Sequence, residues 1–366
     1  MFWIWFLILG LGAAGLTAAA IAPLRAWLLR RAILDLPNDR SSHRRPTPRG
    51  GGLAVIAVVM AGGVAALLLT GTSYDSDPRG LAQNGPLVLL LTALLALLSW
   101  WDDRKGLPAA PRLLAQGLIC AAGLLALPGS GTTFQGLLPG WADLALTWFA
   151  WLWFVNLFNF MDGIDGITGL ETVTIAGGAI LLAGLGATLL GPDFVAGPFL
   201  AEGPRLMLML AVVTGAAIGF LAWNRPPARI FLGDSGSVPL GFLLGWVLLL
   251  LAANGFWAAA LILPLYHLAD ASLTLALRLL RGERIWQAHR QHFYQQAARR
   301  FGGHGRVLAR LVPLNLALVL LAALTIAWRD AGIPALAGAA LLVAACFWHF
   351  RERRPAAGVA GGASPP

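Results

Sequence analysis

The chain carries carboxamide and carboxylate side chains at three-residue intervals between Asn156 and Gly166. They are Asn156, Asn159, Asp162 and Asp165, and they directly follow a tryptophan-rich apolar run. If the apolar helix continues through this segment, the four side chains fall within less than a full turn of one shared face. Four oxygen-rich groups that converge in this way would suit a hard cation or a phosphate-bearing substrate.

Asp102 and Asp103 stand side by side where another apolar stretch ends, and Arg104 and Lys105 follow at once. Two adjacent carboxylates repel each other, so one of them can keep a raised pKa and act as a base. Alternatively, a cation or the nearby basic side chains, including Arg112, stabilise both. The third interpretation is a solvated loop whose charges pair with one another.

A single carboxylate, Asp234, stands between glycines in the sequence Gly233-Asp234-Ser235-Gly236. The glycines permit backbone angles that let amides and the Asp234 oxygens come close to a phosphate or a metal ion. The same pattern also occurs where a turn simply caps a helix. Asn224 adds another amide side chain shortly before this segment.

Histidine and arginine cluster in the segment His289-Arg290-Gln291-His292. Donors at this density suit a diphosphate. Zinc is a poor fit, because no cysteine is near and the carboxylates and amides favour a hard, oxygen-coordinated ion such as Mg²⁺. The alternative is a surface amphipathic helix that lies against anionic lipid.

The elements that must position these groups are strongly apolar. Of the 366 residues, 58% are hydrophobic and only 12% are charged, which excludes a water-soluble globule, and the chain is too long for a single anchor. Stretches of about 17 to 22 apolar residues, the length that crosses a bilayer, recur along the chain. The sequence therefore predicts an all-α polytopic membrane protein with about eleven transmembrane helices, at residues 2–24, 52–70, 86–101, 112–128, 142–159, 173–190, 205–223, 238–253, 256–277, 307–328 and 333–350.

Basic residues predict the orientation, because Lys and Arg accumulate on the cytoplasmic side of membrane segments. With the N-terminus outside, the segments assigned to the cytoplasm hold 23 Lys and Arg residues and the outer segments hold 3. This puts the N-terminus in the periplasm, the C-terminus in the cytoplasm, and all the polar clusters in cytoplasmic active-site loops. Topology thus accounts for most of the net charge of +9, and no nucleic-acid partner is expected.

We expect one transmembrane domain over residues 1–350 and a disordered cytoplasmic tail over 351–366, which is rich in Pro, Gly and Ala. Cys120 and Cys346 lie in apolar stretches and are expected to be buried filler. Asp270 lies inside the predicted ninth span. We expect a structural or supporting role for it, because it sits about two turns from the cytoplasmic end.

Four ordered motifs resemble those of the polyprenyl-phosphate N-acetylhexosamine-1-phosphate transferases, glycosyltransferase family 4. The family's Asp-Asp motif is similar to Asp102-Asp103, and its Gly-Asp-Ser/Thr-Gly motif is similar to Gly233–Gly236. Its Asn-x-x-Asn-x-x-Asp-Gly-x-Asp-Gly motif is similar to residues 156–166, and its final histidine loop to residues 289–295. The resemblance covers about residues 35–300.

The resemblance implies transfer of a sugar-1-phosphate from a UDP-N-acetylhexosamine to undecaprenyl phosphate, with release of UMP, in the bacterial inner membrane. It implies Mg²⁺ as the cofactor, with Mn²⁺ as an alternative. It also implies contact with membrane lipids and allows a homodimer. The implied catalytic residues are Asp102, Asp103 and Asp162, and the implied metal ligands are Asp234, Asn159 and Asp162. The implied substrate-binding residues are Arg44, Arg45, Arg112, Asn156, Asn159, Asp165, Asn224, Phe231, His289, Arg290 and His292.

Within these sets, the resemblance implies individual roles. Asp102 would take a proton from the lipid phosphate or position it. Asp165, Phe231 and Asn224 would contact the uridine, with Phe231 offering a stacking surface. Arg112 stands where the family often has a lysine, which preserves the charge but alters the geometry toward phosphate.

The histidine loop departs from one branch of the family. The muramoyl-pentapeptide enzymes have a run of consecutive histidines, whereas this chain reads His-Arg-Gln-His-Phe-Tyr-Gln from His289. This loop and the segment Pro46–Gly52 look closer to the subgroup that starts O-antigen or other surface polysaccharides. That subgroup uses N-acetylated hexosamines, among them 6-deoxy forms. A GlcNAc-1-phosphate transferase remains an alternative, as does a polytopic lipid flippase or transporter of a different class.

Overall fold

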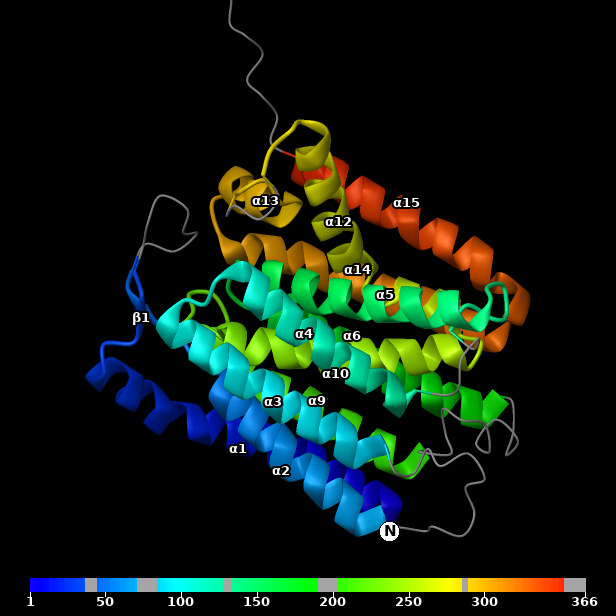
Figure 1. Cartoon of the computed structure of the whole chain (residues 1–366), viewed down its shortest axis with the longest axis horizontal. Helices are drawn as coiled ribbons and strands as arrows, with labels where there is room; N and C mark the ends of the chain where they lie inside the picture. The colour runs from blue at the N-terminus through cyan, green and yellow to red at the C-terminus, as the bar shows by residue number, and fades with distance from the viewer. Residues whose placement is uncertain (37–44, 71–83, 128–132, 190–202, 285–288, 352–366) are drawn as a thin grey trace, which may run out of the picture.

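The computed structural model describes residues 1–36, 45–70, 84–127, 133–189, 203–284 and 289–351. Apart from two strands of two residues each, the regular structure of these residues is helical (Figure 1). Ten of the described helices are long and apolar enough to cross a membrane. The all-α polytopic architecture expected from the sequence is therefore confirmed, while the predicted tail lies outside the described residues from 352 onward.

The first half of the bundle comprises α1 (Phe2–Arg30), α2 (Gly52–Thr70), α3 (Asn84–Lys105), α4 (Ala109–Gly123), α5 (Gly140–Phe160) and α6 (Ile167–Leu189). The second half comprises α9 (Gly203–Asn224), α10 (Asp234–Ala253), α11 (Trp257–Ile262), α12 (Leu265–Leu280), α13 (Phe293–Phe301), α14 (His304–Ala327) and α15 (Gly332–Phe350). Short 3₁₀ turns follow α4 (Leu124–Ala126) and precede α15 (Arg329–Ala331). Two short strands, β1 (Leu34–Asp35) and β2 (Thr47–Pro48), pair antiparallel between α1 and α2.

The predicted ninth span, residues 256–277, is not one helix. It is divided into α11 and α12 at Leu263 and Pro264, because proline lacks the backbone N–H that would continue the helix and its ring crowds the preceding turn. The expectation of eleven continuous spanning helices is thus corrected to ten long helices and one broken pair. α11 packs against α10, α14 and α15, and α12 packs against α5, α13 and α15.

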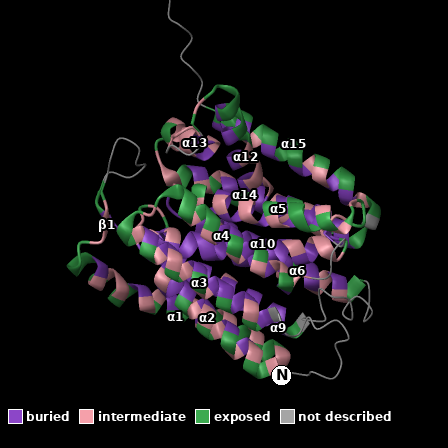
Figure 2. Cartoon of the chain, in the orientation of Figure 1, coloured by how far each residue is buried: buried purple, intermediate pink, exposed green. Residues whose placement is uncertain are grey.

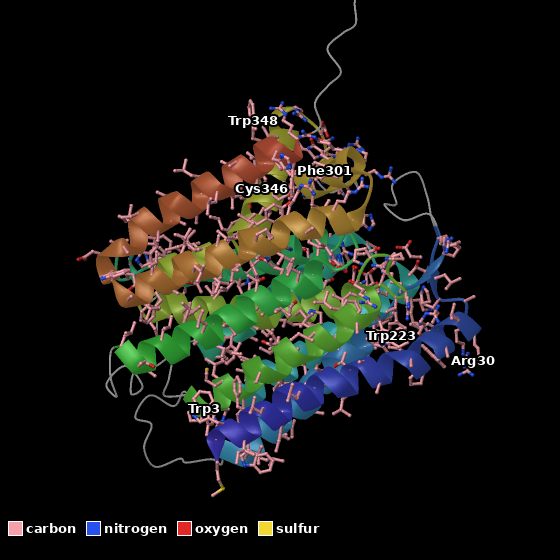
Figure 3. All side chains as sticks on the ribbon, turned by 180° about the vertical axis from the view of Figure 1, so that it is seen from behind. Trp3, Arg30, Trp223, Phe301, Cys346 and Trp348 are labelled. Carbon is pink, nitrogen blue, oxygen red and sulfur yellow. The ribbon has the colours of Figure 1, made fainter. Side chains whose placement is uncertain are left out.

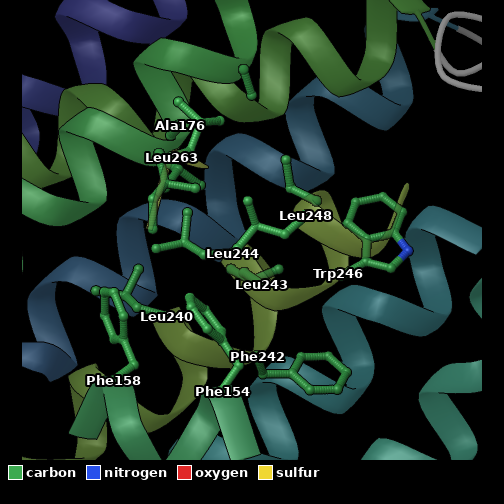
Figure 4. Close-up of a cluster of buried hydrophobic side chains, with 14 of the residues drawn as sticks. Phe154, Phe158, Ala176, Leu240, Phe242, Leu243, Leu244, Trp246, Leu248 and Leu263 are labelled. Carbon is green, nitrogen blue, oxygen red and sulfur yellow. The ribbon is translucent and has the colours of Figure 1, made fainter. Parts of the chain in front are cut away.

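The centre of the molecule is α10, which packs against α2, α3, α5, α6 and α11. It is apolar on every face, and each residue from Ser235 to Leu251 except Leu249 is buried, as expected for a helix enclosed by others. Figure 4 shows its side chains, including Phe242 and Leu244, meeting Phe154 and Phe158. By contrast, α1 and α15 lie at the periphery and expose much of their apolar surface (Figure 2).

The start of α1 and the end of α15 lie at opposite ends of the bundle. α1 ends beside the β1–β2 pair and the loop before α10, where Arg25 Nε donates to the Arg229 carbonyl at 2.9 Å. Its N-terminal end, marked by Trp3 in Figure 3, lies at the other end of the bundle. α15 finishes against α13, where the rings of Phe350 and Phe301 are 5.9 Å apart. The first helix thus begins at one end of the bundle, and the last described helix finishes at the other.

Candidate active site

A cluster of ion pairs joins three segments that are far apart in the sequence. Arg49, in the link between β2 and α2, directs Nη2 to Oδ1 of Asp103 at 2.9 Å and to Oδ1 of Asp234 at 2.5 Å. Asp103 is in the last turn of α3, with only 3% of its side chain exposed, and Asp234 begins α10. One guanidinium therefore bridges two carboxylates, which would otherwise repel each other.

A second arginine completes the cluster. Arg112, in the first turn of α4, lies 2.8 Å from Oδ2 of Asp102 and 3.5 Å from Oδ2 of Asp234. Asp102 also accepts a hydrogen bond from the Leu107 backbone N–H at 2.7 Å. The two adjacent aspartates of α3 thus pair with different arginines, and Asp234 contacts both. We name Arg49, Asp102, Asp103, Arg112 and Asp234 the ion-pair cluster.

Backbone geometry at the start of α10 holds this cluster in place. Gly233 has φ +76, a conformation that L side chains rarely adopt, and a Cβ there would crowd Arg49 and Asp103. From this turn the backbone N–H groups of Asp234 and Ser235 donate to Asp103 at 3.3 and 3.0 Å. The first turn of a helix has free N–H donors, so it is a favourable place for the Asp103 carboxylate.

The link that carries Arg49 is fastened to the same loop. Gly50 and Gly51 donate to the Phe231 carbonyl at 3.1 and 2.8 Å, and Phe231 donates to the Pro48 carbonyl at 2.8 Å. At Gly52 a side chain would overlap the backbone of Gly236, so α2 and α10 start in direct backbone contact. These contacts fix the point from which Arg49 reaches the carboxylates.

The helix expected to continue through Asp165 in fact ends at Phe160. Met161 closes α5, and the turn of residues 161–166 leads into α6. Asn159 Oδ1, still on the helix, accepts a hydrogen bond from Ser237 Oγ of α10 at 2.7 Å. Asn156 instead donates to the Leu152 carbonyl of its own helix. The four polar side chains therefore do not share one helical face, because two of them belong to the turn.

The charges of the ion-pair cluster act on Asp162, which lies in the turn after α5. It accepts a hydrogen bond from Thr168 Oγ1 at 2.5 Å. Burial raises the pKa of the Asp162 carboxyl to about 6, against the opposing effects of Thr168 and Arg49 and with a further rise from Asp234 and Asp103. Burial lowers the pKa of Arg49, but Asp234 and Asp103 outweigh it and raise that pKa overall. Asp162 and the three carboxylates of the ion-pair cluster together outnumber its two arginines.

This excess of carboxylate oxygen matches the donor set of a hard divalent cation. The predicted ligands Asp234, Asn159 and Asp162 offer two carboxylates and one amide oxygen, and they come from α10, α5 and the following turn. Among the described residues, no group of three or more His, Cys, Asp or Glu side chains is close enough together to hold a metal ion. A site here would therefore need the amide or substrate oxygens as further ligands, as Mg²⁺ sites commonly do.

A second polar group surrounds Asp165 and Asn224. Asp165 Oδ2 accepts the Ala228 N–H at 2.9 Å and lies 3.2 Å from Nδ1 of His304. Asn224, which ends α9, accepts the Gly166 N–H at 2.7 Å and donates to the Ile230 carbonyl at 2.8 Å. The turn of residues 161–166 is thereby tied to the loop that leads to Phe231 and Asp234.

The histidine loop is anchored by Asp270, which is fully buried in α12. Its carboxylate lies 3.1 Å from His292 Nδ1 and accepts the backbone N–H groups of Phe293 and Tyr294, both at 3.0 Å. His289 stacks on His292 at 4.8 Å. The expectation of a supporting role for Asp270 therefore has a structural basis: its carboxylate holds the start of α13.

α13 in turn contacts the turn of residues 161–166. Tyr294 is buried, and its hydroxyl donates to the Phe160 carbonyl at 3.2 Å. At Gly163 a side chain would overlap this hydroxyl, so only a glycine allows the close approach. The predicted Arg290 lies at the entry to α13, where its carbonyl accepts a hydrogen bond from Arg299.

Two predicted substrate-binding arginines are not placed in this cluster. Arg44 lies outside the described residues, and Arg45 is exposed, with its carbonyl accepting a hydrogen bond from Thr47. Sequence reasoning did not single out Arg49, although it lies in the segment Pro46–Gly52 that was compared with the family. Its signal was a lone arginine directly before three glycines.

A buried polar group lies apart from these contacts, between α6, α12 and α14. Asn315 donates to Glu171 Oε2 at 3.0 Å and to Thr174 Oγ1 at 2.9 Å, and His267 Nδ1 lies 3.3 Å from Glu171 Oε1. Neither Glu171 nor Asn315 belongs to a charged cluster in the sequence, because Asn315 is isolated in an apolar run and Glu171 has only threonines as polar neighbours. Their contacts bind three helices together.

The comparisons with known proteins agree with the motifs. Residues 86–252 match the family model described as glycosyl transferase family 4. A phospho-N-acetylmuramoyl-pentapeptide-transferase of Synechococcus sp. (strain JA-3-3Ab) is 32% identical over 83% of this chain and 80% of its own length.

Two relatives have names with N-acetylglucosamine in them. A decaprenyl-phosphate N-acetylglucosaminephosphotransferase of Mycolicibacterium smegmatis is 30% identical over 65% of this chain and 58% of its own length. A probable undecaprenyl-phosphate N-acetylglucosaminyl 1-phosphate transferase of Bacillus subtilis is 27% identical over 77% of this chain and 74% of its own length. All three relatives are therefore named as enzymes that transfer a sugar phosphate.

Proposed function

The chain belongs to glycosyl transferase family 4, the prenyl-phosphate sugar-phosphate transferases, and we propose that it transfers an N-acetylated hexosamine-1-phosphate from a UDP-sugar to undecaprenyl phosphate. In this reaction an oxygen of the lipid phosphate attacks the phosphorus that carries the sugar. The bond between that phosphorus and the oxygen of UMP breaks. The products are the lipid diphosphate sugar and UMP.

The observation that carries this proposal is the ion-pair cluster, in which Arg49 and Arg112 link three carboxylates at the same end of the bundle. Two anionic reactants must meet in this reaction, so fixed cationic donors are needed to offset their repulsion and to stabilise charge on the leaving UMP. Arg49 and Arg112 are partly exposed, with 39% and 28% of their side chains accessible, so both can exchange a carboxylate for a phosphate oxygen.

The carboxylates have complementary roles in the proposal. Asp234, Asp162 and the amide of Asn159 would hold Mg²⁺, or Mn²⁺ in its place, and the ion would neutralise charge on the diphosphate. Asp102 and Asp103 would position the lipid phosphate or take its proton. Support comes from the contacts of Asp102 with Arg112 and of Asp103 with Arg49, which keep the two carboxylates in fixed orientations.

Further residues would bind the rest of the donor. Asp165, Asn224 and Phe231 would contact the uridine, and the hydrogen bonds that join their loops support a single subsite there. His289, Arg290 and His292 would contact the diphosphate from the start of α13. Asn156 and Asn224 have less support as direct substrate contacts, because the amide of Asn156 donates to its own helix and the amide of Asn224 already bonds Gly166 and Ile230.

For the biological role, we propose the start of O-antigen or another surface polysaccharide in the bacterial inner membrane, with the site on the cytoplasmic side. The non-consecutive histidines at residues 289 and 292 favour this over a peptidoglycan role. GlcNAc-1-phosphate transfer is the second candidate, and the names of the M. smegmatis and B. subtilis relatives favour it. A homodimer stays a prediction.

A lipid flippase or transporter is the rival of a different class. A transporter would be expected to gather polar groups near the middle of the membrane, between repeated halves. Here the ion-pair cluster lies at helix ends: the end of α3 and the starts of α4 and α10. This arrangement favours an enzyme that works at the membrane surface.

The test is UMP release by the purified protein with undecaprenyl phosphate and Mg²⁺, across UDP-N-acetylhexosamines and their 6-deoxy forms. Release that requires both the lipid and the metal would support the transferase and identify the sugar. Asp234→Asn is expected to abolish release without loss of folding. Absence of release across the whole panel, from protein with a cooperative thermal transition, would count against the proposal.

A further inference from the structure

His304 begins α14 beside the turn of residues 161–166. Its ring Nδ1 lies 3.2 Å from Oδ2 of Asp165 and 3.4 Å from the backbone nitrogen of the same residue. Only 12% of the His304 side chain is exposed, so the contact is largely shielded from water. If Nδ1 carries a proton it donates to the carboxylate, and if it does not it accepts the backbone N–H. In either tautomer, His304 holds Asp165.

The carboxylate of Asp165 has one engaged oxygen and one open oxygen. Oδ2 faces His304 and also accepts the Ala228 N–H at 2.9 Å. Within the described residues, Oδ1 accepts no hydrogen bond, and Asp165 retains 8% of its surface exposed. A carboxylate held through one oxygen presents the other in a defined direction.

Such an oxygen suits one edge of a pyrimidine. Uracil carries an N–H between its two ring carbonyls, and a carboxylate oxygen is a strong acceptor for it. Cytosine has an unprotonated ring nitrogen at the same place, which would face the carboxylate without a hydrogen. A site built to accept from an N–H discriminates strongly against a ligand that lacks it.

We propose that His304 is a positioning residue that fixes the Asp165 carboxylate for the base of a uridine nucleotide, and thereby favours uridine over cytidine. The inference rests on the proposed function, in which Asp165 contacts the uridine. His304 acts through Asp165 and touches no reacting atom. Loss of its ring nitrogen frees the carboxylate to rotate, which weakens nucleotide binding while the ion-pair cluster stays intact.

Binding of UMP and CMP to the purified full-length protein, measured by calorimetry, tests this directly. His304→Ala is expected to raise the Kd for UMP about tenfold and the Kd for CMP much less. His304→Asn should recover most of the UMP affinity, because its amide can donate or accept near the place of Nδ1. His349→Ala, an exposed histidine that contacts Arg310, is the matched control and should leave both values unchanged.

Steady-state kinetics separate positioning from general loss of structure. His304→Ala should raise the KM for the UDP-sugar and leave the KM for the lipid and the kcat at saturation close to wild type. In an Asp165→Asn background the same substitution should add little, since both changes act on one contact. The inference about His304 is overturned, and the proposed function is not, if the His304→Ala protein binds UMP as tightly as wild type. The same holds if the variant loses affinity for lipid and nucleotide equally. Wild-type protein that binds no UMP overturns the proposed function as well.

Discussion

At the scale of single residues, Arg49 is the side chain on which the site depends most. Its guanidinium contacts two carboxylates from different helices at once. Arginine presents several donors in a rigid plane, whereas lysine presents one compact charge. The identity of the residue, and not only its charge, should therefore matter.

Arg49→Lys is expected to lower kcat/KM about 10- to 100-fold, because lysine keeps the charge but its ammonium does not reproduce the placement of Nη2, which donates to Asp234 and pairs with Asp103. The measurement is UMP release at several lipid concentrations. Arg31→Lys, an exposed residue just after α1, is the matched control and should retain wild-type activity. Equal activity of both variants would show that Arg49 contributes charge alone.

Asp162 gives a prediction that depends on pH. Its pKa is raised by burial to about 6 in the folded protein, above the ordinary value of 3.8. Because the unfolded chain ionises first, the folded state loses stability as the pH rises from about 4 to about 6, and the loss is complete above that range. Below about 4 the carboxyl is protonated in both states, and the effect disappears.

Asp162→Asn removes this ionisation, so without divalent cations the variant should melt on the order of 1–3 °C above wild type at pH 8. The difference should vanish near pH 4. Thermal melts of both proteins at several pH values measure it, and added Mg²⁺ should raise the wild-type melting temperature more than that of the variant. A variant that is less stable than wild type at pH 8 would contradict this account.

At the scale of elements, three contacts bring the site together. α2 and α10 begin in backbone contact at Gly52 and Gly236. α12 holds α13 through Asp270, and α13 packs Tyr294 on the turn at Gly163. All three contacts lie beside predicted site residues, so they can be changed without removing a functional group.

Gly52→Ala should reduce activity strongly, because its new methyl group meets backbone atoms that cannot move aside. The two helix starts must then separate, and Arg49 and Asp234 separate with them. Gly177→Ala in α6 is the matched control, since nothing lies within 4 Å of a Cβ there. The measurements are the activity and the melting temperature of the Gly52→Ala and Gly177→Ala proteins. Equal values for the two variants would mean that the starts of α2 and α10 can separate without loss of activity.

Asp270→Asn should lower kcat about 10- to 100-fold, because a small displacement of His292 and α13 is costly for catalysis. The loss should remain smaller than that of Asp102→Asn. Ser272→Ala on the same helix, which removes only the partner of Trp153, serves as the control. An Asp270→Asn protein that is as inactive as Asp102→Asn, with an unchanged melting temperature, would assign Asp270 a direct part in the reaction.

At the scale of the whole molecule, the distribution of Lys and Arg predicts which face carries the site. The bundle begins at the far end with α1 and ends on the site side with α15. If each of the ten long described helices and the broken pair α11–α12 crosses the membrane once, the number of crossings is odd. The expected orientation has the site on the cytoplasmic side.

Single-cysteine labelling tests this orientation, after Cys120 and Cys346 have been replaced by alanine. A membrane-impermeant maleimide should modify Phe2→Cys in spheroplasts but should modify Arg351→Cys only after permeabilisation. The reverse pattern would invert the orientation, and labelling of both from one side would require an even number of crossings.

The sequence by itself determined the membrane architecture, the polar clusters and their common face. These properties depend on runs of consecutive residues, since the length of an apolar run and the charges beside it are local. It also supplied Asp102, Asp103, Asp162 and Asp234 as candidates, because an acidic side chain beside an apolar run is conspicuous. The break at Pro264 had a local signal as well, although the apolar composition around it predicted a continuous span.

Only the tertiary structure decided which charges pair. Arg49 meets Asp234 across 185 positions of sequence, and His304 meets Asp165 across 139. The end of α5 at Phe160 likewise depends on distant contacts, with Tyr294 at the Phe160 carbonyl and with Ser237 at Asn159. Hydrogen bonds and ion pairs act over a few ångströms, so their partners follow from how helices pack, which a local pattern of hydrophobicity does not encode.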